Sequence, residues 1–164
     1  MKFLSVREKL AKALGLTQRV IAKNFTLPIL ESVLIETEKG QMKISATNLE
    51  MAIRCWVQGK VEKEGSLTVP AAFLLNIVQN LHTEQITLET KANILHINAE
   101  QYHGSIKGQN AEDFPSVPEV KGEVIATFDG ALLYQGLAQL QNIVTISEAR
   151  PEISGVYMVL EGTK

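Results

Sequence analysis

The apolar positions near the start of the chain recur at the spacing of an α-helix. They form one face that consists of Val6, Leu10, Ala13, Leu14, Val20 and Ile21. Residues three, four and seven apart share one side of a helix, so the pattern predicts a helix over residues 7–21 that buries this face. Lys9, Lys12 and Arg19 fall on a different stripe, provided that the helix continues through Gly15, which costs about 1 kcal/mol relative to alanine.

A second helical pattern covers residues 71–81. Its predicted apolar face consists of Phe73, Leu74, Ile77, Val78 and Leu81. Pro70 precedes it, and proline is favoured at the first helical position because its missing N–H would have no partner there. The sequence therefore predicts a second amphipathic helix, preceded by a short strand over residues 66–70.

Alternating patterns predict strands after each helix. Residues 29–37 read as extended, and Met42, Ile44 and Ala46 alternate in the next strand. Met51, Ile53, Cys55 and Val57 then alternate against Ala52, Arg54 and Trp56, as in a half-buried strand. Strands are again expected over 85–90, 94–98 and 103–107, with turns between them. The order strand, helix, strands thus occurs twice, which predicts an α+β domain with two helices on one face of an antiparallel sheet.

The beginning of the chain matches its end at an offset of 123 positions. Leu10 falls on Leu133, Leu14 on Leu137, and Pro28 on Pro151. The apolar positions and a proline recur at this offset, whereas the basic positions do not. The repeat is therefore one of architecture, and the positive charge belongs to the first copy alone. We expect one complete domain over residues 1–120 and the truncated start of a second over 121–164, with a helix near 130–143 and a strand near 153–160.

The net charge of −2 is unevenly distributed. Residues 1–27 contain six lysines and arginines against Glu8 alone, a balance of +5, so the remainder sums to −7. This asymmetry indicates a local surface that attracts anions. The alternative is a solvated helix face that is basic without a partner, and charge alone does not decide between the two.

Several classes of protein are disfavoured by composition. No apolar run approaches the roughly 18–20 residues that span a bilayer, so no membrane association is expected. The single cysteine, Cys55, fits a reducing cytoplasm. It alternates with Ile53 and Val57, as a small core residue would. Asn48 and Glu50 read as a polar cluster at the start of a strand, and no nucleophile–base pair or metal spacing occurs. We therefore expect no enzyme activity and no cofactor.

Short motifs along the whole chain resemble one protein family. They are Met1-Lys2-Phe3, Thr26-Leu27-Pro28-Ile29-Leu30, Ala46-Thr47-Asn48-Leu49-Glu50-Met51, Thr68-Val69-Pro70-Ala71, Glu112-Asp113-Phe114-Pro115, Arg150-Pro151 and Gly155-Val156. Their joint spacing is similar to that of the bacterial DNA sliding clamps, the beta subunits of DNA polymerase III. The resemblance implies the DNA-clamp fold with three similar domains per subunit. Two subunits join head to tail into a ring, with sheets outside and helices lining the hole.

The resemblance also implies the function. A clamp is a cytoplasmic processivity factor that encircles duplex DNA without sequence specificity and performs no chemistry itself. It tethers the replicative DNA polymerase, is placed on DNA by a clamp loader, and is a homodimer at full length. Phosphate contacts suit such sliding, because they position a protein on DNA without reading its bases.

The candidate DNA-binding residues come from the basic stripe and from the resemblance. They are Lys9, Lys12, Arg19, Lys23, Asn24, Gln79, Ser147 and Arg150. Family members often have arginine or lysine in the first-domain loop and at the start of the second inner helix. This chain has Asn24 in the loop and Ala72 and Phe73 in the helix, which implies weaker DNA contact there. Asn48 also replaces the family's usual aspartate.

One other class of function stays open at this point. A duplicated α+β domain also suits a non-catalytic scaffold that binds proteins and shows no salt-dependent association with DNA. Trp56, on the polar side of its strand, is a candidate interface residue under either interpretation.

Overall fold

β1 (Lys2–Val6) and α1 (Arg7–Gln18) open a computed structural model that describes residues 1–21, 27–118, 122–124, 126–141, 143 and 154–160. The chain divides into two units, Met1–Pro118 and Glu119–Lys164. The remaining elements of the first unit are η1 (Pro28–Glu31), β2 (Ser32–Glu38), β3 (Gln41–Thr47), β4 (Ala52–Lys63), β5 (Gly65–Pro70), α2 (Ala71–Asn80), β6 (Gln85–Lys91), β7 (Ile94–Ala99), β8 (Tyr102–Lys107) and η2 (Ala111–Asp113).

The eight strands form one antiparallel sheet in the order β5-β2-β3-β4-β1-β6-β7-β8. The long strand β4 changes partners along its length: residues 52–58 pair with β3, and residues 59–63 pair with β1. Gly59 stands at this change, where a Cβ would lie 2.3 Å from the carbonyl oxygen of Leu4. Only glycine permits the backbones to approach so closely.

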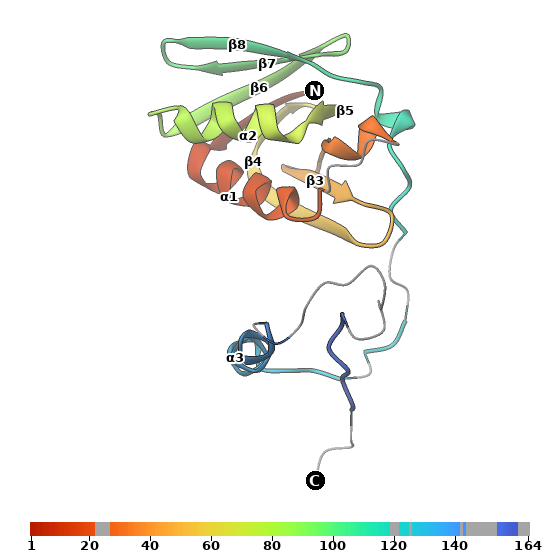
Figure 1. The fold of residues 1–164 in the computed structure, drawn as a ribbon. Coiled ribbons are helices and arrows are strands. Elements are labelled where there is room, and N and C mark those ends of the chain that lie inside the picture. The colour runs from red at the N-terminus through yellow and green to blue at the C-terminus, as the bar shows by residue number, and fades with distance from the viewer. Residues whose placement is uncertain (22–26, 119–121, 125, 142, 144–153, 161–164) are drawn as a thin grey trace. The chain divides into compact units, whose positions relative to one another are not determined.

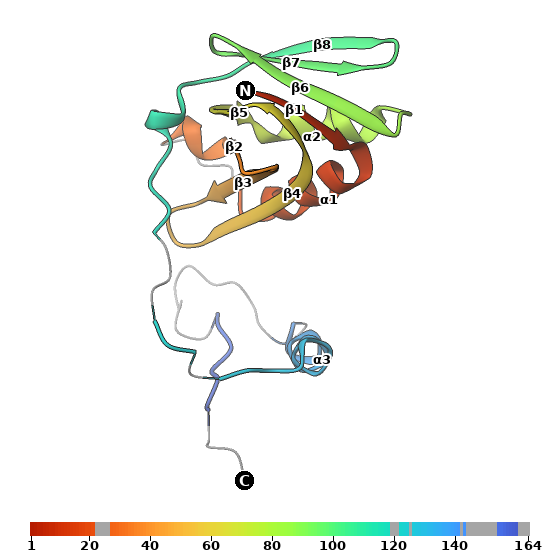
Figure 2. The same cartoon turned by 180° about the vertical axis from the view of Figure 1, so that it is seen from behind.

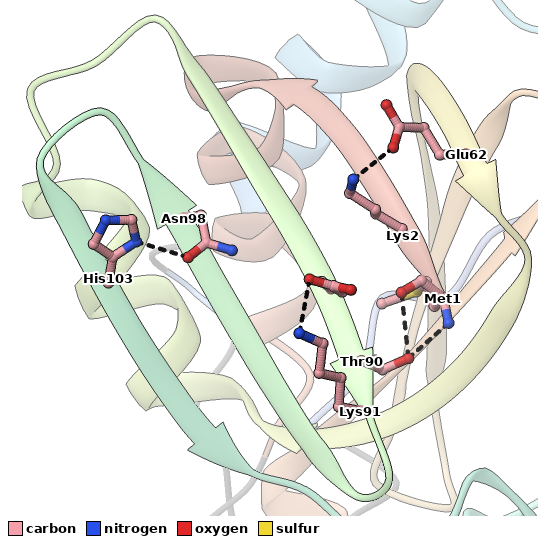
Figure 3. A network of polar contacts seen from close by, with 8 residues as sticks. Met1, Lys2, Glu62, Thr90, Lys91, Asn98 and His103 are labelled. Carbon is pink, nitrogen blue, oxygen red and sulfur yellow. Dashed lines mark hydrogen bonds and ion pairs between the residues drawn. The ribbon is translucent and has the colours of Figure 1, made fainter.

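Polar contacts tie β1 to both of its neighbouring strands (Figure 3). The Met1 amino group donates to the Thr90 Oγ1 at 2.7 Å. The Thr90 N–H donates to the Met1 carbonyl at 2.9 Å. On the other side, Lys2 forms an ion pair of 2.8 Å with Glu62. The first strand is therefore held in the middle of the sheet between β4 and β6.

Both helices cover the same face of the sheet (Figures 1 and 2), which confirms the predicted fold class. α1 buries Leu10 and Leu14, and α2 buries Leu74 and Val78, in one core cluster with the inward side chains of the strands. Fully burying such a side chain is worth about 1.5–3 kcal/mol. The first N–H of α1 is satisfied by the Glu84 carbonyl at 2.9 Å, so α1 is also fixed to the start of β6.

Some details differ from the sequence predictions in the first half of the chain. Residues 29–31 belong to the 3₁₀ turn η1 rather than to a strand, because the Leu30 N–H bonds to the Leu27 carbonyl at 3.0 Å. Met51 is exposed and lies in the turn before β4, where its N–H bonds to the Asn48 Oδ1 at 2.7 Å. Asn48 and Glu50 are thus part of a polar turn, as the sequence indicated. Val6 ends β1 and is exposed, outside the helical face assigned to it.

The buried face of α2 was partly misassigned. Phe73 is 66% exposed, whereas Leu75, which was not predicted, is buried. A helix lying on a sheet buries residues at spacings of three, four and seven, and Ala71, Leu74, Leu75 and Val78 fit that stripe. Phe73, Leu74 and Leu75 are consecutive apolar residues, so the sequence pattern does not show which of them face the core.

The second unit contains α3 (Gly130–Leu140), close to the predicted bounds of 130–143. Its start is capped by Asp129, whose Oδ1 accepts from the N–H groups of Ala131 and Leu132 at 2.8 and 3.0 Å. The strand expected over 153–160 is wrong for residues 154–160, which form no strand, and residue 153 lies outside the described residues. A strand needs a hydrogen-bonded neighbour, and the described part of this unit supplies none. That this unit begins a second clamp domain remains a prediction.

Candidate nucleic-acid interface

α1 presents the predicted basic stripe on the side away from the core. The helix continues through Gly15 as expected, and Arg19 forms its C-terminal cap. At 3.6 residues per turn, Lys9, Lys12 and Arg19 fall within about 80° around the helix axis. All three are exposed, while Leu10 and Leu14 on the buried side are fully enclosed. The structure therefore brings these three predicted residues together on one surface, which we call the basic stripe.

The charges of the basic stripe have no acidic partner among the residues that the structure describes. The ion pairs formed by the described residues involve Lys2, Lys39, Lys43, Lys60 and Lys91, and none involves the stripe. Arg19 stands at the C-terminus of α1, where a cation is favoured by the helix dipole. Three cations that pair with no described acidic residue lie on one helix face and can attract an anionic ligand.

A hollow of about 450 Å³ opens beside the stripe, between α1 and β4. Lys9, Lys12 and Leu16 line it from the helix, and Trp56 and Gln58 line it from the strand. Trp56 is 57% exposed, so the candidate interface residue lies next to the stripe. Sequence patterns did not reveal this neighbourhood, because α1 and β4 are separated by three elements along the chain.

α2 adds no charge to this surface. Gln79, Ala72 and Phe73 are exposed, and no residue of α2 is charged. The two helices pack side by side in the same layer, so Gln79 can reach a partner only as a neutral hydrogen-bonding group. Lys23, Asn24, Ser147 and Arg150 lie outside the described residues.

The other groups that could carry chemistry form no reactive or metal-binding arrangement among the described residues. Partial burial raises the pKa of the Cys55 thiol, which disfavours the reactive thiolate. Within the part of the chain that the structure describes, no three His, Cys, Asp or Glu side chains form a group that could hold a metal ion. None of the described helices has the length and apolar character needed to cross a membrane.

Comparison with known proteins gives the family. The family model described as "DNA polymerase III beta subunit, N-terminal domain" matches residues 1–118. The chain belongs to the family of the DNA polymerase III beta subunit. The match ends at Pro118, which is also where the first structural unit ends.

Relatives of this beta-subunit family chain are named beta sliding clamp. The one from Synechocystis is 28% identical over 96% of this chain and 43% of its own length, and that from Vibrio cholerae is 28% identical over 99% and 45%. The solved sliding clamp of Caulobacter crescentus has a TM-score of 0.69 at 31% identity, covering 73% of this chain and 33% of that one. The Pseudomonas aeruginosa clamp bound to griselimycin gives 0.70 at 31%, covering 76% and 34%. The chain thus spans less than half the length of these relatives.

Proposed function

We propose that this chain supplies the first domain of a cytoplasmic DNA sliding clamp, in which the basic stripe faces the duplex. The observation that carries the proposal is the placement of Lys9, Lys12 and Arg19, exposed and unpaired on the helical layer of a domain whose family is that of the beta subunit. In this arrangement α1 points its cations at DNA, and the sheet forms the outside.

The physical reason is the nature of the phosphate backbone. Duplex DNA carries about one charge per 1.7 Å of axis, and cations on flexible side chains attract it equally at every sequence. Such contacts hold a protein near DNA without fixing its position, as sliding requires. The proposal assigns no chemical step to this chain, and its partners are double-stranded DNA, a replicative polymerase, a clamp loader and a second copy of the full-length subunit.

Retention on DNA tests the encircling role. The protein, as encoded by its complete reading frame, is loaded by the clamp loader onto closed circular and linearised duplexes of equal length. A clamp stays on the circle and slides off the ends of the linear molecule. Equal dissociation from both, or no association with either, would instead favour a scaffold that binds proteins alone.

Charge removal tests the stripe. We expect a Lys12→Ala/Arg19→Ala variant to bind duplex DNA more weakly at every sequence, with a salt slope reduced by about 0.9 per lost phosphate contact. A Lys39→Ala/Lys60→Ala variant removes the same charge from side chains that are 84% and 72% exposed elsewhere. If both variants change DNA affinity and salt slope equally, the stripe is only a solvated face.

A further inference from the structure

Arg54 is a half-buried cation on the first unit. It lies on β4 opposite Ser45 of β3, and none of the ion pairs between described residues includes it. Its Nε is enclosed and has no hydrogen-bond partner among the described residues, whereas its Nη2 donates to the carbonyl oxygen of Val117. Enclosing a guanidinium costs free energy unless a strong contact offsets it. The Val117 carbonyl supplies that contact.

Val117 belongs to the last segment of the first unit, residues 115–118, which we call the exit strap. The chain is fixed just before it, because Phe114 is buried and its N–H bonds to the Ala111 carbonyl at 3.2 Å. The strap itself cannot join the sheet as a strand, since Pro115 and Pro118 have no N–H to donate. It runs on past the β3–β4 hairpin in both views (Figures 1 and 2).

The strap has one hydrogen bond in the described structure, and Arg54 donates it. We propose that Arg54 is a positioning residue whose guanidinium latches the exit strap to β4 and so fixes the point where the chain leaves the first unit. A charge-assisted hydrogen bond is about twice as strong as a neutral one, so the choice of arginine suits a latch. An apolar side chain of similar length would fill the space without holding the strap.

The consequence for a clamp rests on the proposed function, whereas the latch does not. A ring needs each domain to follow the preceding one in a reproducible direction, and a fixed exit point reduces the conformations that the connection can adopt. Loss of the latch therefore loosens the exit strap while the rest of the first unit stays folded.

The test uses the Arg54→Met variant of this chain. Backbone ¹⁵N relaxation reports order parameters at Ser116 and Val117, and we expect about 0.85 in the original chain and below about 0.6 in the variant. Arg54→Lys retains a charged donor and should recover part of the order. Lys60→Met is the control: Lys60 is exposed on the same strand and pairs with Glu62, so its loss should leave both order parameters unchanged.

Equal order parameters in the original chain and in folded Arg54→Met would overturn the proposal, whatever the DNA measurements show. If Arg54→Met fails to fold, the unmodified chain still decides. Its latched Arg54 guanidinium protons should exchange with water at least about tenfold more slowly than those of exposed Arg19. Equal exchange rates at the two arginines would show that no latch exists.

Discussion

Thr68 and Gln109 pair through two backbone hydrogen bonds, from the Thr68 N–H to the Gln109 carbonyl at 3.1 Å and back at 2.8 Å. β5 stands at one end of the sheet, and Gln109 follows β8 at the other. The pair therefore joins the two ends of the strand order. It also places Gly108 and the Thr68 side chain in a tightly packed corner. Two substitutions there are expected to have different effects on the free energy of unfolding.

Gly108→Ala should destabilise the first unit. A Cβ at Gly108 would lie 2.6 Å from the Thr68 carbonyl oxygen and 2.9 Å from Leu67 side-chain atoms, so the backbone would have to move. Overpacking of this kind costs about 1–3 kcal/mol, measurable by urea unfolding. Gly15→Ala in α1 is the control, because nothing lies within 4 Å of its Cβ, and it should raise stability by about 0.5–1 kcal/mol. A similar effect of both substitutions would contradict the close contact.

Thr68→Val should leave stability unchanged or raise it by about 1 kcal/mol. The Thr68 hydroxyl is fully buried and finds no partner among the described residues, so valine removes an unsatisfied polar atom at nearly constant volume. Thr17→Val is the matched comparison, since the buried Thr17 hydroxyl donates to the Leu14 carbonyl at 3.0 Å. That variant should lose about 1 kcal/mol. A loss at Thr68 equal to that at Thr17 would indicate a partner for the Thr68 hydroxyl.

Leu74→Ala should lower the free energy of unfolding by about 2–5 kcal/mol, because Leu74 is fully buried in the shared core. Phe73→Gln, one residue earlier, should change it by only about 0.5 kcal/mol, since the ring is mostly exposed. Thermal and denaturant unfolding of the pair measure the difference. Similarly large losses at both positions would instead support the buried face that the sequence alone suggested, which includes Phe73 and Leu74.

The Lys2–Glu62 pair should be visible in a pH titration. The hydrogen bond from Lys2 and its charge lower the pKa of the Glu62 carboxyl. A depressed carboxyl pKa contributes stability above the ordinary glutamate value of about 4.3, and this contribution is lost as the pH falls through the folded-state value. In Lys2→Met, NMR titration should show the pKa of Glu62 moving upward. An unchanged Glu62 pKa would mean that the pair does not persist in solution.

The sequence predicts the elements well where local patterns are strong. The two helices, the strands that alternate and the basic stripe follow from side-chain spacing alone, because periods of 3.6 and 2 reveal which side is buried. Phe73 and Met51 were misplaced because consecutive apolar residues leave the phase ambiguous and because the Asn48 turn competes with a strand. The Arg54–Val117 contact joins residues 63 positions apart, and no local pattern reports such a pair.

The position of β1 has a consequence for folding during synthesis. β1 is a central strand, but both of its neighbours follow it along the chain, and the second of them, β6, is complete only at Lys91. The corner at Thr68 waits longer still, until Gln109 has emerged. Such pairings between distant residues delay folding, because a long loop must close before any contact compensates for its lost entropy. β1 and α1 should therefore remain without their final packing until most of the first unit has been made, and chaperones that bind exposed apolar segments have longer access to these two elements than to the later strands.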